Sequence, residues 1–307
     1  MSIGNTIILT VLGIFLLSGT YVHYRGRVRH SLKRQATGHS TLMAPYNVLM
    51  YLASAVPNTP FLHVEEFPEL ESLRSNWKTI RDEALQLREA GHIRAADGYN
   101  DLAFNSFFRK GWTRFYLKWY DDFLPSARRS CPKTVALLRS MPSINAALFA
   151  ELPPGGRLVA HRDPFAGSLR YHLGLITPNS ENCRILVDGE LYYWKDGEGV
   201  LFDETFIHRA ENESGQTRII LFCDVRRPLR YRWANSLNKL MSRYVVKQSA
   251  TRNVPDEKVG FLNKVFVYLY QIRLTAKKIK RRSRPLYYTL KFVVYGGFVV
   301  FLLWVTR

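Results

Sequence analysis

Two histidines and an aspartate in the second half of the chain could bind one metal ion together. His161 and Asp163 are separated by one residue in the stretch H-R-D-P, and His208 follows 45 residues after Asp163. Two imidazoles and one carboxylate leave three positions of an octahedral Fe(II) ion free, as in the non-haem iron oxygenases, where a keto acid takes two positions and dioxygen the third. The spacing alone is a weak signal, because a single histidine more often has a structural role and Asp163 before a proline is also typical of a turn.

Three further polar residues strengthen the hypothesis of a site. Arg218 lies ten residues after His208 on the next predicted strand, R-I-I-L-F, where its guanidinium can form a bidentate pair with the distal carboxylate of 2-oxoglutarate. Arg170 and His172 alternate with apolar residues in L-R-Y-H-L, so both side chains point to one face of their strand. Charge inside a small barrel is unfavourable unless it is paired or bound to a ligand, so the alternation favours a site. Either arginine taken alone is more typical of a surface charge.

The region after Ser143 predicts the β-structure that must position these residues. Short runs rich in β-branched and aromatic residues alternate with turn signals, as in R-L-V-A-H, C-R-I-L-V and R-I-I-L-F-C-D-V. Regular spacing of this kind is typical of an all-β barrel or a jelly roll of the cupin type. The pairs Asp188-Gly189 and Asp196-Gly197 indicate hairpin turns.

The region before Ser143 is predicted to be mainly helical. Apolar residues recur at helical spacing between residues 69 and 95, which indicates one or two amphipathic helices, and Pro132 begins a short helix that ends near Arg139. Aromatic and basic side chains are interleaved from Phe104 to Tyr120. They could stack on nucleic acid bases, but no nucleic-acid-binding motif accompanies them, so a core strand is favoured and no nucleic acid partner is expected.

The first residues of the chain predict a membrane helix. Residues 1–24 contain no Asp, Glu, Lys or Arg, and Ile3–Val22 is an apolar run long enough to span a bilayer. A signal peptide is disfavoured, because no basic residue precedes the run and no small-residue cleavage site follows it. By the positive-inside rule, the cations that follow place the next part of the chain in the cytoplasm. These cations are Arg25, Arg27, Arg29, Lys33 and Arg34.

A second apolar run, Leu286–Val305, is interrupted only by Lys291 and follows a basic cluster between Lys277 and Arg284. The positive-inside rule places this cluster in the cytoplasm too, so a second membrane span is expected. A helix that lies on the membrane or packs against the protein is the alternative. The helical pattern between residues 261 and 272 is typical of a membrane-surface helix.

Composition limits the partners and the compartment. The 307 residues carry a net charge of +19, which suits an anionic membrane surface, a phosphorylated substrate or nucleic acid without choosing among them. Three widely spaced cysteines, Cys131, Cys183 and Cys223, argue against a disulfide framework and fit a reducing compartment.

Together these patterns divide the chain into five segments. They are an N-terminal transmembrane helix (1–24), a basic and apolar membrane-proximal segment (25–66), a catalytic domain (67–228), a helical basic membrane-proximal region (229–284) and a C-terminal transmembrane helix (285–307). The expected fold is mainly β, with a double-stranded β-helix core, flanking α-helices and terminal membrane helices.

Residues from about Phe67 to Pro228 resemble the aspartyl/asparaginyl β-hydroxylase superfamily of Fe(II)/2-oxoglutarate dioxygenases. The resemblance is carried by H-R-D-P, L-R-Y-H-L-G-L, F-D-E-T-F-I-H and R-I-I-L-F-C-D-V. Within the superfamily the chain looks most like the bacterial lipid A acyl-chain 2-hydroxylases, because the animal protein hydroxylases have glycine where this chain has Asp163. The resemblance implies that His161, Asp163 and His208 hold iron. It also implies that Arg218 binds the 5-carboxylate of 2-oxoglutarate and that Arg170 and His172 reach its other carboxylate.

The activity implied by this resemblance is hydroxylation of the 2-position of a fatty acyl chain of lipid A or its precursor. It would use Fe(II), 2-oxoglutarate and dioxygen at the cytoplasmic face of the bacterial inner membrane. Two alternatives remain open: β-hydroxylation of Asp or Asn in a protein, and a non-catalytic membrane-bound module that binds lipid. The sequence leaves the acyl chain, the stereochemistry and the oligomeric state undetermined.

Overall fold

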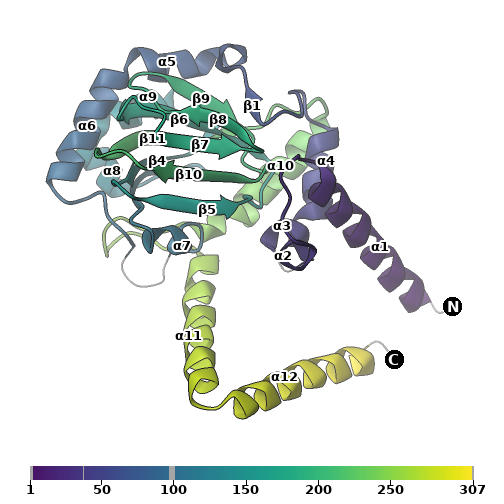
Figure 1. Cartoon of the computed structure of the whole chain (residues 1–307). Coiled ribbons are helices and arrows are strands. Elements are labelled where there is room, and N and C mark those ends of the chain that lie inside the picture. Colours follow the sequence, from purple (N-terminus) through teal and green to yellow (C-terminus); the bar gives the residue numbers. More distant parts are fainter. Residues whose placement is uncertain (1–2, 37, 97–100, 306–307) are drawn as a thin grey trace.

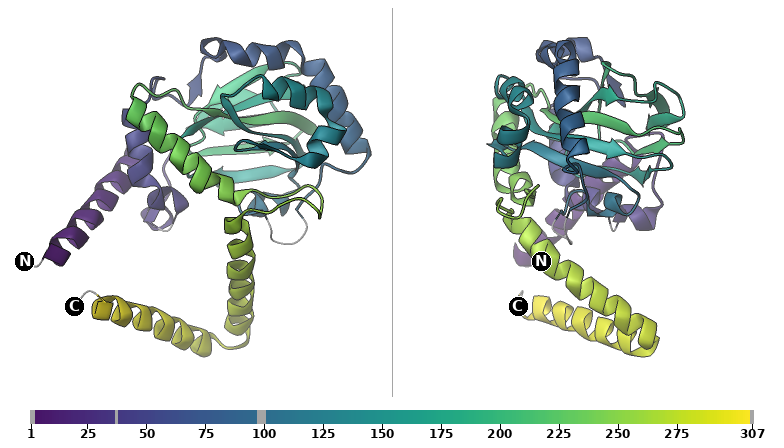
Figure 2. Two further views of the ribbon diagram at one scale, coloured as in Figure 1. Left: turned by 180° about the vertical axis from the view of Figure 1, so that it is seen from behind. Right: turned by 90° about the vertical axis from the view of Figure 1, so that its left-hand side faces the viewer.

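The computed structural model describes residues 3–36, 38–96 and 101–305. Two antiparallel β-sheets face each other at the centre, helices cover the outer face of the larger sheet, and the terminal helices project from one side (Figures 1 and 2). The buried apolar side chains between the sheets and under the helices form one continuous core.

The strand order defines the fold. In the larger sheet the strands are, from edge to edge, β1 (Phe61–Leu62), β9 (Gly199–Phe202), β6 (Ser168–Ile176), β11 (Arg218–Arg226), β4 (Ile144–Leu152), β2 (Thr113–Trp119) and β3 (Asp122–Phe123). In the smaller sheet they are β5 (Arg157–His161), β10 (His208–Asn212), β7 (Cys183–Val187) and β8 (Glu190–Tyr193).

Strands β4 to β11 cross back and forth between the two sheets, and every pairing is antiparallel. This order is that of a double-stranded β-helix, so the predicted jelly-roll core is confirmed. Strands β6 and β11 pair side by side at the centre of the larger sheet and are almost wholly buried, because helices cover one face and the smaller sheet covers the other. Polar residues on their inner face therefore point into the barrel.

The two predicted hairpins have different outcomes. Asp188 and Gly189 have φ values of 51° and 90° and connect β7 directly to β8, so this hairpin is confirmed as a two-residue turn with both central residues left-handed. The prediction for Asp196-Gly197 is wrong, because this turn connects β8 to β9 in the other sheet. An Asp-Gly pair favours a tight turn, but the packing of the sheets decides which strands pair on either side of it.

Helices flank the barrel before and after the strands. Before and among the first strands are α2 (Leu32–Ala36), α3 (His39–Leu42), α4 (Ala44–Leu52), α5 (Glu71–Ser75), α6 (Trp77–Glu89), α7 (Asn105–Phe108), α8 (Pro125–Ser130) and α9 (Pro132–Arg139). After the strands come α10 (Arg232–Tyr244) and α11 (Phe261–Arg282). Single 3-10 turns occupy Val64–Glu66, Pro68–Leu70 and Val246–Ser249. The predicted helices at 69–95, Pro132–Arg139 and 261–272 are confirmed.

The first and last helices are long. Among the residues that the structure describes, α1 (Ile3–Tyr24) contains the one segment, Gly4–Tyr24, that is long and apolar enough to cross a membrane. The predicted second span, Leu286–Val305, lies in α12 (Arg284–Val305). Most side chains of its second half lie outside the described residues, so that span stays a prediction.

Candidate active site

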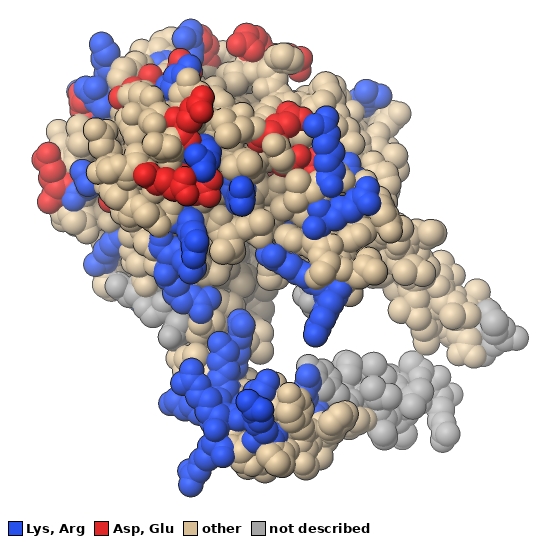
Figure 3. Space-filling view, viewed as in Figure 1, with Lys and Arg blue, Asp and Glu red and all other residues tan. Residues whose placement is uncertain are grey.

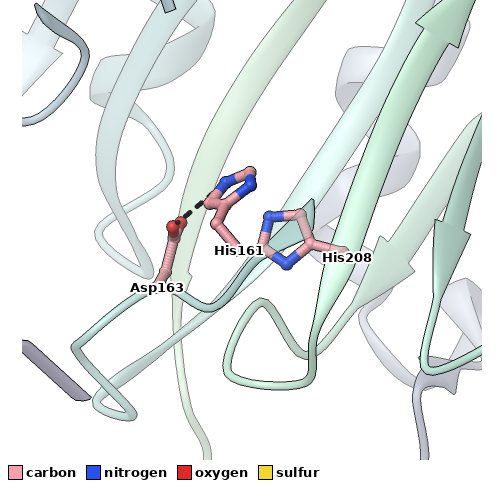
Figure 4. A group of neighbouring side chains, drawn as sticks. All are labelled: His161, Asp163 and His208. Atoms are coloured by element: carbon pink, nitrogen blue, oxygen red, sulfur yellow. Dashed lines mark ion pairs between the residues drawn. The ribbon is translucent and has the colours of Figure 1, made fainter. Parts of the chain in front are cut away.

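The three predicted metal ligands lie together at one end of the smaller sheet (Figure 4). His161 ends β5 and His208 begins β10, and the two residues face each other in the register of these paired strands. Asp163 follows β5 in a loop that is held by a hydrogen bond from its backbone N–H to the carbonyl oxygen of Glu204, 3.0 Å away. One ligand atom from each of the three residues lies within 4.8 Å of the others, so a single metal ion fits among them.

Backbone hydrogen bonds orient both imidazole rings. His161 Nδ1 lies 2.8 Å from the carbonyl oxygen of Val159, and His208 Nδ1 lies 3.0 Å from that of Phe206. A carbonyl oxygen only accepts, so each Nδ1 carries the proton and each Nε2 keeps a free lone pair. This is the arrangement by which proteins prepare histidines for metal binding.

The charges of the three ligands also suit a divalent cation. Burial and the neighbouring His161 ring lower the pKa of His208 to about 3, and burial lowers the pKa of His161 although Asp163 opposes the shift. Burial raises the pKa of Asp163, but Arg170 and the two histidines outweigh this effect and hold that pKa below its usual value. Two neutral imidazoles and one carboxylate are therefore present at neutral pH, as a hard to borderline divalent metal requires.

Arg170 contacts Asp163, the carboxylate among the three predicted metal ligands. Its Nη2 donates to Asp163 Oδ2 at 2.9 Å, and its Nε donates to Asp224 Oδ1 at 2.9 Å. The Arg170 guanidinium also lies 3.9 Å above the ring of Phe222. Asp224 thus holds Arg170, which in turn orients Asp163, while the contact predicted between Arg170 and 2-oxoglutarate stays a prediction.

We expect Asp224→Asn to lower the affinity for Fe(II) by about tenfold, because removal of a group that orients a metal ligand commonly costs ten- to a hundredfold. Anaerobic titration with Fe(II), or with Co(II) followed by its visible absorption, measures this affinity directly. Asp82→Asn is the control, since Asp82 forms an exposed ion pair with Arg81 far from the site. Equal affinities in the two variants would show that Asp224 has no part in orienting the metal ligand.

Further inside the barrel, several buried hydrogen-bond donors have no partner among the residues that the structure describes. These donors are Nε and Nη2 of Arg218 and Nε1 of Trp194. Both ring nitrogens of His172 also lack a partner in this part of the structure. Burial lowers the pKa of Arg218 to about 10, so the guanidinium still carries its charge at neutral pH. Burying a charge without a partner is energetically costly. The buried Arg218 guanidinium therefore indicates that an anionic ligand pairs with it. A dicarboxylate between Arg218 and the metal ligands fits this requirement.

Aromatic rings pack against these polar groups. The Arg218 guanidinium lies 4.3 Å from the centre of the Trp194 ring, and His172 lies between Phe202 and Phe222, with ring centres 5.0 and 5.2 Å away. The surroundings of Arg218 and His172 are therefore mainly apolar, as is typical of a site that binds a small ligand through a few polar groups.

The sequence analysis singled out Arg170, His172 and Arg218 but not all of their neighbours in the barrel. Phe202, Phe222 and Asp224 were missed. Asp224 and Arg218 are separated by an even number of positions on β11, so their side chains point to the same face of the strand. The alternation argument used for Arg170 and His172 would therefore also have indicated Asp224.

The chain matches known proteins over this domain. The profile of the family described as aspartyl/asparaginyl beta-hydroxylase matches residues 74–228, just over half of the 307 residues. The chain is 31% identical over 176 residues to an ornithine lipid ester-linked acyl 2-hydroxylase of Rhizobium tropici, covering 56% of this chain and 62% of that protein. It is 30% identical over 165 residues to the human aspartyl/asparaginyl beta-hydroxylase, covering 52% of this chain and 21% of that protein.

A solved prolyl-4-hydroxylase of Pseudomonas putida aligns with a TM-score of 0.35 at 17% identity, covering 51% of this chain and 87% of that one. The alignments span less than two thirds of the length of both curated relatives. The family match coincides with the segment that carries the predicted metal ligands, the buried Arg218 and the jelly-roll strands. This chain therefore belongs to the aspartyl/asparaginyl beta-hydroxylase family.

Proposed function

We propose that the protein is an Fe(II)- and 2-oxoglutarate-dependent hydroxylase that acts on an acyl chain of a membrane lipid. The observation that carries the chemistry is the pairing of a His161–Asp163–His208 cluster with a buried, unpaired Arg218. When bound, Fe(II) with 2-oxoglutarate and dioxygen supplies the oxidant that converts a C–H bond to C–OH, with succinate and carbon dioxide as the other products.

The protein's own residues bind and position the reactants. His161 and His208 offer neutral Nε2 atoms, and Asp163 offers a carboxylate that Arg170 keeps oriented and ionised. We assign Arg218 to the distal carboxylate of the cosubstrate, and we assign His172, whose ring nitrogens have no partner among the described residues, to the other carboxylate. The side chains of His161 and Asp163 are 18% and 22% exposed whereas His208 is buried, so the substrate approaches the metal from the His161 and Asp163 side.

We infer a lipid substrate from the membrane-directed features of the chain. Arg25 directly follows the apolar helix α1 and ties it to the barrel, because its Nη2 lies 2.5 Å from Oδ2 of Asp203, the residue after β9. Lys and Arg gather around α11 and the start of α12, while Asp and Glu lie mainly over the opposite part of the barrel (Figure 3). Anionic lipids attract such cations with about 1 kcal/mol for each Lys or Arg. The name of the Rhizobium tropici relative also describes hydroxylation of a lipid acyl chain.

The specific proposal is 2-hydroxylation of an acyl chain of lipid A or its precursor. Mass spectrometry of lipids from cells with the gene, without it, and with the His208→Ala variant tests it. We expect a gain of one oxygen at carbon 2 of a lipid A acyl chain that is absent from the last two strains. The same oxygen on another membrane lipid would replace lipid A as the substrate. Unchanged lipids together with a hydroxylated Asp or Asn in a peptide would support protein hydroxylation, the activity named for the human relative.

We also propose that the barrel faces the cytoplasm of a bacterial cell. The supporting observation is the placement of cations immediately after α1 and before α12, which the positive-inside rule assigns to the cytoplasmic side. Reporter fusions after Arg34 and before Lys277 should both report a cytoplasmic position, and a fusion at Arg307 should report an external one. A cytoplasmic signal at Arg307 would make α12 a surface-bound helix, and an external signal at Arg34 would reverse the orientation.

A further inference from the structure

The outer face of α10 is unusual for a helix that packs on a barrel. Its exposed positions repeat at helical spacing, and they are Arg232, Trp233, Ser236, Lys239, Leu240, Arg243 and Tyr244. No acidic residue occurs between Asp224 and Asp256, a stretch that holds eight Lys or Arg. None of the three exposed cations forms an ion pair within the described part of the chain. The face therefore combines unneutralised positive charge with exposed Trp, Leu and Tyr.

The inner face of α10 fixes this helix rigidly to the catalytic barrel. Asn238 is buried, its Nδ2 donates to the carbonyl oxygen of Gly167 at 2.9 Å, and its Oδ1 accepts from Tyr46 Oη at 3.0 Å. A Cβ on Gly167 would lie 2.2 Å from Asn238 Oδ1, so glycine is needed for this close approach. Gly167 ends the loop that begins directly after the metal ligand Asp163. Whatever α10 contacts is therefore positioned relative to the metal site.

Both ends of α10 are connected to membrane-directed elements. At its start, the Arg230 N–H donates to the carbonyl oxygen of Ala53, which follows α4, and α4 packs against α1 through Tyr51 and Tyr21, with ring centres 6.2 Å apart. At its end, a short 3-10 turn leads toward α11, where Asn263 donates to the carbonyl oxygen of Ala250 at 2.7 Å. Figure 2 shows α10 crossing the outside of the barrel from the end of α1 to the start of α11.

We propose that α10 lies in the headgroup layer of an anionic membrane, with Trp233, Leu240 and Tyr244 inserted and its three exposed cations on lipid phosphates. Cations beside Trp and Leu on one helix face are the composition of helices that bind in the plane of a membrane, and unneutralised cations complement an anionic surface. The inference rests on the membrane placement of α1 proposed above. It does not rest on the identity of the hydroxylated lipid. Because α10 is fixed to the loop after Asp163, this contact sets the orientation of the metal site over the bilayer.

Fluorescent labelling of single introduced cysteines tests this contact. The three native cysteines are fully buried, so an environment-sensitive fluorophore attaches selectively to Leu240→Cys or to Leu191→Cys. Leu191 on β8 is the matched control, since it is 51% exposed and Leu240 is 53% exposed. The full chain is placed in nanodiscs of phosphatidylcholine and phosphatidylglycerol, with or without brominated acyl chains that quench the fluorophore on contact.

We expect bromine to quench the label at residue 240 at least about twice as strongly as the label at residue 191. Arg232→Gln, Lys239→Gln and Arg243→Gln together should reduce quenching at residue 240 by about half. A control triple, Lys78→Gln, Arg157→Gln and Arg209→Gln, should leave it unchanged. Equal quenching at the two labels would overturn the proposal. A label at residue 240 that is shielded from water but not quenched would also overturn it, because a protein and not a lipid would then cover α10. Quenching is measured without turnover, so a failed lipid-hydroxylation assay does not affect this result.

Discussion

Replacing His208 by Ala should lower both Fe(II) affinity and oxygenase turnover by at least about a hundredfold, because the change removes a ligand atom and not merely a group that orients one. His208 is neutral at the pH of the assay, since its pKa lies at about 3, so the loss does not come from the removal of a charge. Anaerobic Fe(II) titration measures the affinity, and release of succinate from 2-oxoglutarate measures the turnover.

The fold should survive this change. The free energy of unfolding of the metal-free protein is expected to fall by no more than about 2 kcal/mol, as for loss of one buried side chain that donates a single hydrogen bond to the backbone. His63→Ala is the control, because His63 is exposed and lies outside the barrel. Full Fe(II) affinity in the His208→Ala variant would contradict the metal assignment. If that variant unfolds globally, the Asp163→Ala and His161→Ala variants test the same assignment.

Replacing Arg218 by Ala should raise the KM for 2-oxoglutarate by about a hundredfold, equivalent to about 3 kcal/mol for a bidentate pair between two charged groups. The KM for the acyl substrate should stay within about twofold, because Arg218 serves the cosubstrate alone. Steady-state kinetics with each substrate varied in turn separates the two effects. An unchanged KM for 2-oxoglutarate would assign the distal carboxylate to another cation, such as Arg170.

Thermal unfolding is a second test of the role of Arg218. In the metal-free and cosubstrate-free protein, Arg218 is a buried charge with unpaired donors, so its removal should not lower the melting temperature. 2-Oxoglutarate should raise the melting temperature of the parent protein but not that of the Arg218→Ala variant. Arg209→Ala is the matched control, because Arg209 lies on β10 with an exposed side chain. A purely structural role for Arg218 would give the opposite result, a large loss of stability without ligand.

Several parts of the site could be predicted from the sequence because they depend on short-range patterns. The alternation in L-R-Y-H-L placed Arg170 and His172 on one strand face, since successive side chains of a strand point to opposite sides. The helix at Pro132–Arg139 and the turn at Asp188-Gly189 follow from the backbone preferences of proline and of the Asp-Gly pair. The metal-ligand residue types, combined with a β-rich region, indicated non-haem iron chemistry.

Only the tertiary structure decided which groups face each other across long sequence separations. It pairs β5 with β10, so that His161 meets His208, and it places Arg170 between Asp224 and Asp163, two contacts that no local pattern indicates. The position of the Asp196-Gly197 turn between two sheets and the basic, aromatic outer face of α10 also depend on packing. Local patterns specify turns, faces and residue types, whereas contacts between strands far apart in sequence are selected by the burial of the whole core, which no short window of sequence contains.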